Sequence, residues 1–223
     1  MLLECVEKET GQNPIFAVIW MHGLGADGND FVPMIPEIVA ADWPPVRFVF
    51  PHAPRRAVTI NAGMSMRAWY DITGMEIAQR QDEAGIRKSI EQVEALIARE
   101  IERGIPASRI ILAGFSQGAA MSISVGLRHS ERLAGIIALS GYLPLERQLE
   151  TEQSPANADV PIFMGHGSLD PVVPQTLGML CRDFLRSHDY NVDWHSYTMA
   201  HQVCMEEIAD LRAWIGERVS GLN

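Results

Sequence analysis

Short runs of apolar residues alternate along the chain with longer stretches in which apolar residues recur at helical spacing. Six runs have the length of strands, at residues 15–20, 46–50, 109–113, 133–139, 160–164 and 192–197. The first five are almost continuously apolar, which is typical of strands buried on both faces. The pattern therefore predicts a parallel sheet that is covered by helices.

The clearest helix is expected between the second and third runs, over residues 83–103. Isoleucine and valine recur there at helical spacing, and Gly104 and Pro106 end the pattern. Further helices are predicted over residues 117–128, 175–187 and 205–215. This alternation predicts an α/β fold with a mostly parallel central sheet flanked by helices. Ligands of such folds bind at the carboxyl ends of the strands, so the residues just after each run are the candidates for chemistry.

Composition narrows the class of protein. A length of 223 residues favours one domain over residues 1–223. With 18 Lys and Arg against 28 Asp and Glu, the net charge of −10 argues against nucleic acid or an anionic membrane as the main partner. No apolar stretch approaches the ~20 residues of a membrane span, and the first residues lack the basic start of a signal peptide, so we expect no stable membrane insertion. Cys5, Cys181 and Cys204 lie far apart, which disfavours disulfides and zinc and favours a cytoplasmic setting.

A glycine motif follows the first run. Residues 23–28 read Gly-Leu-Gly-Ala-Asp-Gly and fit the dinucleotide-binding pattern G-x-G-x-x-G. That pattern needs a helix that opens inside the motif, whereas Pro33 and Pro36 interrupt any helix here. It also needs an acid after the second strand, and Asp42 precedes that strand instead. Nucleotide binding is therefore disfavoured.

A second glycine motif follows the third run. Residues 114–118 read Gly-Phe-Ser-Gln-Gly and fit G-x-S-x-G, the nucleophile elbow of a serine hydrolase. Its position between a buried strand and a helix is the context that the motif requires, and its glycines allow the strained turn and the close approach of strand and helix. The structural alternative is a glycine-rich turn with a solvated serine.

A nucleophilic Ser116 needs a base and an orienting acid, which follow in the order Ser, acid, His after later strands. Asp170 follows the fifth run, at a turn that Pro171 stiffens, and His201 follows the last run. The other six histidines lie elsewhere, and among them His166 is interpreted as a brace for the acid loop. We therefore predict Ser116, Asp170 and His201 as a catalytic triad.

The first glycine motif, residues 23–28, fits a role in the same active site as this triad. Acyl transfer needs backbone N–H groups that bind the developing oxyanion. One comes from the residue after the nucleophile, Gln117, and the other from an HG-type loop. Glycines on both sides of Leu24 predict its N–H as the second donor, and the structural alternative is a flexible turn.

Several blocks, in this order, resemble the carboxylesterase/acyl-protein thioesterase family of α/β-hydrolases, also called the phospholipase/carboxylesterase family. The blocks are residues 22–28, 51–54, 69–72, 114–119, 139–144 and 166–174, followed by His201. This sequence departs from the family pattern at Ala200, where glycine is common, and at Leu169, where a polar residue is frequent.

The resemblance implies an α/β-hydrolase fold without a large cap domain, and a cytoplasmic serine hydrolase of esters or thioesters. It implies the same triad, Ser116, Asp170 and His201, with Leu24 and Gln117 as oxyanion donors. Implied substrates are small carboxylic esters or thioesters, lysophospholipids and S-acylated proteins. A homodimer is also implied. No cofactor and no metal ion are expected.

Methionine and aromatic residues gather between residues 63 and 77, and they suit an adaptable acyl groove. Resemblance favours a lid-like loop near Ile72 and Met75. We predict Leu24, Ile72, Met75 and Trp69 as substrate-binding residues, with Trp69 structural first. The alternative is that these side chains merely cover the sheet. At the level of function, the alternative is a catalytically silent ligand-binding protein of the same fold, for which a missing triad or oxyanion element would be expected.

Overall fold

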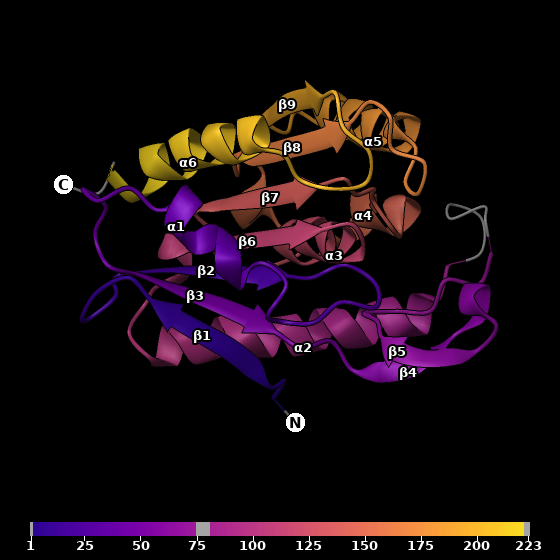
Figure 1. Ribbon diagram of the computed structural model, residues 1–223, viewed down its shortest axis with the longest axis horizontal. Coiled ribbons are helices and arrows are strands. Elements are labelled where there is room, and N and C mark those ends of the chain that lie inside the picture. Colours follow the sequence, from indigo (N-terminus) through magenta and orange to yellow (C-terminus); the bar gives the residue numbers. More distant parts are fainter. Residues whose placement is uncertain (1, 75–80, 221–223) are drawn as a thin grey trace.

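One seven-stranded sheet runs through the molecule (Figure 1), and the computed structural model describes residues 2–74 and 81–220. The strands of this sheet are β1 (Cys5–Glu9), β2 (Phe16–Met21), β3 (Val46–Pro51), β6 (Ile110–Phe115), β7 (Gly135–Leu139), β8 (Ile162–Gly167) and β9 (Val192–Tyr197). Their order is β1-β3-β2-β6-β7-β8-β9. Strand β1 is antiparallel to β3, and the other neighbours are parallel. The mostly parallel sheet that the sequence predicts is confirmed.

Helices cover both faces of the sheet (Figure 1). The helices are α1 (Ile35–Ile38), α2 (Glu83–Glu102), α3 (Gln117–Gly126), α4 (Glu146–Glu152), α5 (Gln175–Ser187) and α6 (Met205–Ser220). Helices α1 and α6 pack with one hydrophobic core, and α2, α3, α4 and α5 pack with the other. Every residue of β2, β3, β7 and β8 is buried, because the side chains of these strands alternate between the two cores.

The four predicted helices are all present, and the clearest, α2, begins as its sequence dictates. The Asp82 carboxylate accepts a hydrogen bond of 2.9 Å from the Gly85 N–H and caps the first turn. Five branched apolar residues that predicted the helix face the sheet or lie against it, and Val93 and Ile97 are fully buried. Helix α6 continues five residues beyond its predicted end at Ile215.

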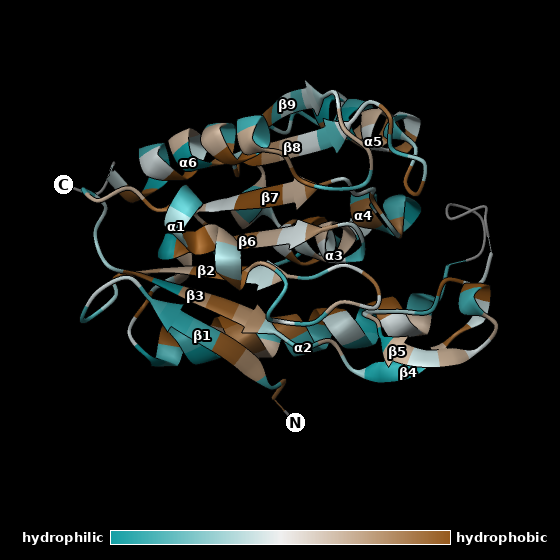
Figure 2. Cartoon of the chain, in the orientation of Figure 1, coloured by the Kyte–Doolittle hydropathy of each residue, from teal (hydrophilic) through white to brown (hydrophobic). Residues whose placement is uncertain are grey.

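Three strands, and the short helices α1 and α4, have no counterpart in the sequence prediction. Strand β1 has the sequence Cys-Val-Glu-Lys-Glu, and Figure 2 shows polar positions on it, in contrast to the mainly apolar β3 beside it. A separate two-stranded hairpin is formed by β4 (Arg55–Val58) and β5 (Met64–Arg67). These strands have one exposed face or lie outside the main sheet, so they lack the continuous apolar run that marks a buried strand.

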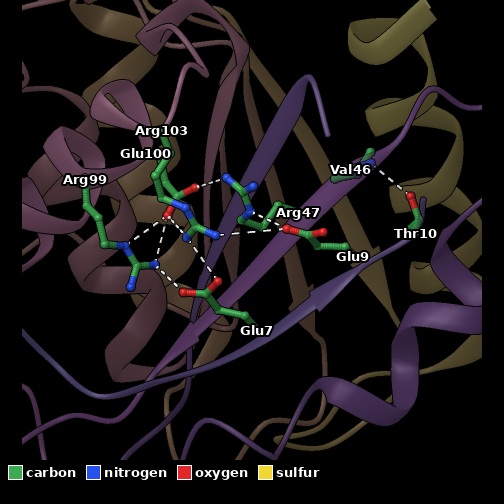
Figure 3. A network of polar contacts seen from close by, with 8 residues as sticks. All are labelled: Glu7, Glu9, Thr10, Val46, Arg47, Arg99, Glu100 and Arg103. Carbon is green, nitrogen blue, oxygen red and sulfur yellow. Dashed lines mark hydrogen bonds and ion pairs between the residues drawn. The ribbon is translucent and has the colours of Figure 1, made fainter. Parts of the chain in front are cut away.

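An ion-pair network holds the polar edge strand β1 against the rest of the fold (Figure 3). The Glu100 carboxylate of α2 is fully buried, and it pairs with Arg47 of β3 at 2.8 Å and with Arg99 and Arg103 at 2.9 Å. Arg99 and Arg103 also pair with Glu7 of β1, at 2.9 and 3.0 Å. Three guanidinium groups around one carboxylate compensate its burial. Ion pairs therefore connect the polar positions of β1 to α2.

Candidate active site

The turn from β6 into α3 carries Ser116. Its backbone has φ 55° and ψ −118°, a conformation that L-residues rarely adopt, so the serine sits on a strained turn. Glycine is required on both sides because the segments approach closely. A Cβ on Gly114 would lie 2.1 Å from the Gly118 carbonyl oxygen, and a Cβ on Gly118 would lie 2.1 Å from the Met21 carbonyl oxygen. The sequence therefore folds here into a sharp elbow between strand and helix.

The three residues predicted as a triad meet in one line of hydrogen bonds. Nε2 of His201 lies 2.9 Å from Oγ of Ser116, and Nδ1 of His201 lies 2.7 Å from Oδ2 of Asp170. A carboxylate only accepts, so Nδ1–H donates to Asp170 and Nε2 is left to accept the Ser116 hydroxyl proton. The Asp170 side chain is fully buried, whereas that of His201 is 15% exposed. The arrangement is able to draw a proton from Ser116 toward His201.

Backbone donors and a second histidine fix the acid loop after β8. Oδ1 of Asp170 accepts hydrogen bonds from the N–H groups of Val172 and Val173, at 2.8 and 2.9 Å. Nε2 of His166 lies 2.9 Å from the Val173 carbonyl oxygen and donates to it. Burial lowers the pKa of His166, which keeps its imidazole neutral beside Asp170. His166 therefore braces the loop without competing as a cation for the carboxylate.

The glycine loop after β2 is fixed by a buried imidazole. Nδ1 of His22 donates to the Gly23 carbonyl oxygen at 2.7 Å, and Nε2 accepts from the Ala53 N–H at 3.1 Å. Burial lowers the pKa of His22 to about 4, so the ring is neutral and both hydrogen bonds persist at neutral pH. The next residue, Leu24, precedes Gly25, which adopts the left-handed φ of 80°. The loop thus holds the Leu24 backbone in a defined place beside Ser116.

The side chain of Gln117 connects the elbow to the segment around Trp69. Its Oε1 accepts from the Trp69 N–H and its Nε2 donates to the Tyr70 carbonyl oxygen, both at 2.8 Å. The Trp69 indole N–H donates to the His22 carbonyl oxygen at 2.9 Å. Within residues 2–74 and 81–220, the backbone N–H groups of Leu24 and Gln117 donate to no protein acceptor. Both N–H groups are thus available to an oxygen atom placed beside Ser116.

A cavity of about 330 Å³ opens beside Ser116 and His201. Its lining is mostly apolar and includes Leu24, Ile60, Ile72, Phe115, Tyr142 and Val172. Of the predicted substrate-binding residues, the structure brings Leu24 and Ile72 to this cavity. Trp69 is fully buried behind it, against His22, and is not part of the described lining. Met75 lies outside the described residues.

The sequence prediction missed Tyr142 as a cavity residue. The Tyr142 hydroxyl lies 2.5 Å from that of the fully buried Tyr70. Burial raises the pKa of Tyr142 to about 12, so this wall of the cavity stays uncharged at neutral pH. The signal was present, because Tyr142 belongs to the block 139–144 that carries the family resemblance, but no spacing rule connects that block to Ser116.

Comparison with known proteins shows to which family this α/β chain belongs. The family model described as phospholipase/carboxylesterase matches residues 4–218. The chain belongs to the phospholipase/carboxylesterase family. It is 39% identical to acyl-protein thioesterase 1 of Yarrowia lipolytica, covering 91% of each chain. It is 41% identical to acyl-protein thioesterase 1 of Neurospora crassa, covering 98% of this chain and 91% of the relative.

Solved structures have the same fold as this chain. The crystal structure of SOBER1 of Arabidopsis thaliana superposes with a TM-score of 0.86 at 26% identity, covering 91% of this chain and 98% of that one. Acyl-protein thioesterase 2 of Zea mays has a TM-score of 0.83 at 24% identity, covering 96% and 99% of the two chains. The family model and the fungal relatives confirm the predicted family and the hydrolase class, and the solved structures confirm the α/β-hydrolase fold. None of the helices in the described part of the chain combines the length and the apolar character needed to cross a membrane.

This phospholipase/carboxylesterase chain also buries an acid at the start of helix α6. Glu207 lies in the first turn of α6, is fully buried, and packs against Gly165 of β8, where a Cβ would lie 2.1 Å from its Oε1. Neither carboxylate oxygen has a hydrogen-bond partner among the described residues. Burial, and next the nearby Asp210, raise the pKa of Glu207 to about 8. The folded protein therefore keeps this carboxyl protonated where the unfolded chain ionises it.

Glu207→Gln is expected to remove a pH-dependent loss of stability. Since the pKa of Glu207 is about 8 in the folded protein and near 4.5 when unperturbed, the wild-type free energy of unfolding falls as the pH rises from about 4.5 to 8. The shift corresponds to a loss on the order of 4 kcal/mol. Urea unfolding at pH 5 and pH 8 measures this slope. The exposed neighbour Glu206→Gln should keep the wild-type slope, and an unchanged slope in Glu207→Gln would contradict the assignment.

Proposed function

We propose that this chain is a serine hydrolase that removes acyl groups from thioesters and carboxylic esters, with S-acylated proteins as its main substrate class. The observation that carries the proposal is the hydrogen-bonded line from Ser116 through His201 to Asp170 beside an apolar cavity. Both fungal relatives are named acyl-protein thioesterase 1, which supports thioesters as substrates. Hydrolysis of lysophospholipids, a cytoplasmic setting and a homodimer stay predictions of the sequence.

In the acylation step, Oγ of Ser116 attacks the carbonyl carbon of the substrate. Nε2 of His201, 2.9 Å from that oxygen, takes the proton, and Asp170 holds the imidazole in the required tautomer. The carbonyl oxygen becomes negatively charged and is stabilised by the N–H groups of Leu24 and Gln117. The turn at Ser116, the glycine loop that carries Leu24, and Asp170 are fixed by hydrogen bonds before the substrate binds. The active site therefore needs little reorganisation during the reaction.

The tetrahedral intermediate then expels the leaving group, which takes the proton from His201 and departs as a thiol or an alcohol. An acyl ester of Ser116 remains. Water attacks this ester while His201 accepts one of its protons, and the second intermediate collapses to release the carboxylic acid and to return the proton to Ser116. The neutral His166 and the backbone donors keep Asp170 in place in both halves of the reaction.

The cavity supports a limit on the acyl chain. An engineered cavity of about 150 Å³ holds one benzene molecule, so about 330 Å³ accommodates roughly a dozen non-hydrogen atoms. Leu24, Ile72 and Phe115 supply apolar contacts along it, and Tyr142 closes part of its buried side. This volume favours medium acyl chains over acetyl groups, which leave most of the apolar lining uncovered.

The test compares thioesters and p-nitrophenyl esters whose acyl chains range from two to sixteen carbons. We expect kcat/KM to rise with chain length to a maximum at about ten carbons, as the cavity fills, and then to fall. Rates measured with the same leaving group isolate the acyl contribution. A steady fall from acetyl onward would contradict the assignment of the cavity, and hydrolysis of the oxygen esters alone would contradict a thioesterase.

A further inference from the structure

A single carboxylate lines the catalytic cavity among otherwise mostly apolar described residues. Asp30 belongs to the same loop after β2 as Leu24, and it borders the cavity that contains Ser116 and His201. The Asp30 side chain makes no hydrogen bond or ion pair within the described ranges 2–74 and 81–220. Partial burial, and next Asp27, raise its pKa above the ordinary value. A carboxylate at the mouth of an apolar cavity, without a counter-ion among the described residues, is able to attract a cation of the substrate.

Exposure distinguishes the two ends of this cavity. Asp30 and Val172 are exposed, so they form the rim. Tyr142 and Val173 are 7% and 4% exposed, so they form the interior. An acyl chain is apolar and fits the interior, whereas a leaving group that is part of a protein must stay outside, at the rim. Asp30 therefore lies on the side of the leaving group.

The charge balance around the rim favours a positive leaving group. Besides Asp30, the ionisable side chains in the described lining are His201 and Tyr142, and the carboxylate of Asp27 also acts on Asp30. Arg67 points its guanidinium to the Ala53 carbonyl oxygen and forms no described ion pair with Asp30. With a net charge of −10, the whole chain adds to the attraction.

We propose that Asp30 is a specificity-determining residue, which selects S-acylated peptides that carry lysine or arginine beside the acylated cysteine. This inference rests on the proposed thioesterase function and adds the chemistry of the leaving group. Side chains next to the cysteine extend to the rim when the thioester carbonyl lies at Ser116. A phosphocholine headgroup fits less well, because its phosphate lies between the ester and the ammonium group and is repelled by Asp30.

The experiment uses two S-octanoyl peptides that differ only in having lysine or glutamine on both sides of the cysteine. We expect wild type to hydrolyse the lysine peptide with a kcat/KM about fivefold higher, which is the range of an exposed ion pair. Asp30→Asn should abolish this preference and leave the rate on a neutral thioester, S-octanoyl mercaptoethanol, within twofold. Asp30→Lys should reverse the preference, and high salt should reduce it in wild type.

The matched control is Glu131→Gln, which changes the net charge equally. Glu131 is exposed and lies just before β7, at the amino ends of the parallel strands, whereas Ser116 lies at their carboxyl ends. This variant should therefore keep the preference. A preference that persists in Asp30→Asn, or that is absent from wild type, overturns the assignment. The assignment is also overturned if hydrolysis of lysophosphatidylcholine depends on Asp30 while the lysine and glutamine peptides are hydrolysed at equal rates. If wild type fails to cleave the neutral thioester, that result contradicts the proposed function and therefore also this inference.

Discussion

Ser116→Ala is expected to lower kcat about 10⁶-fold, the loss seen when a triad serine is removed. The substitution deletes the hydroxyl oxygen that lies 2.9 Å from Nε2 of His201 and attacks the carbonyl carbon, so no acyl-enzyme forms. Alanine fits the site, because the Ser116 hydroxyl makes no described hydrogen bond other than that to His201. The measurement is kcat on an octanoyl thioester, with thermal unfolding to verify that the fold persists.

Labelling with a fluorophosphonate supplies the control for that loss. Wild type should be labelled once per chain, on the peptide that contains Ser116, and the alanine variant should not be labelled. A variant that keeps most of its ester hydrolysis would exclude Ser116 as the nucleophile. Wild type that resists the label and turns over no ester would support the alternative of a silent ligand-binding protein with this fold.

Asp170→Asn is expected to reduce kcat about 10⁴-fold with little change in KM, as for the equivalent change in a well-studied serine protease triad. Asp170 accepts from Nδ1–H of His201 at 2.7 Å. An amide nitrogen turned to that position donates instead, and this stabilises the tautomer in which Nε2 carries the proton and is unable to accept one from Ser116. The other oxygen still accepts from the N–H groups of Val172 and Val173, so the loop should keep its shape.

The matched control for this prediction is Asp159→Asn. Asp159 also lies near β8, but it precedes the strand, is exposed, and pairs with Arg132 on the surface. Its loss should leave kcat unchanged. Comparable activity of Asp170→Asn and wild type would show that another acid orients His201, and a large loss in Asp159→Asn would contradict the rule that the acid follows its strand.

The elements predicted best from the sequence are those whose signal is local and strong. Buried parallel strands read as continuous apolar runs, and the five such runs became strands. The sixth run, which is less apolar, became the edge strand β9 with the predicted bounds, Val192–Tyr197. The geometry of Ser116, Asp170 and His201 followed from two rules that do not depend on packing. One is the order of these residues along the chain, and the other is that the carboxyl ends of parallel strands meet at one edge.

The elements that escaped prediction depend on contacts between distant segments. Strand β1 is held by ion pairs with Arg99 and Arg103, and its sequence alone is indistinguishable from a polar loop. The place of Trp69 behind the cavity depends on its bond to His22, and that of Tyr142 depends on Tyr70. No periodicity encodes such pairings. The single domain over residues 1–223 stays a prediction, to which the continuous sheet gives support.

The site joins segments that lie far apart in the chain, and this has a consequence for synthesis and refolding. His201 and Ser116 are separated by 85 residues, and the glycine loop begins at His22. During translation, a growing chain has no base for Ser116 until residue 201 has left the ribosome. Parallel pairing between distant strands is also slow compared with helix formation. Recovery of hydrolysis after dilution from denaturant will therefore report completion of the whole sheet, later than any helical signal.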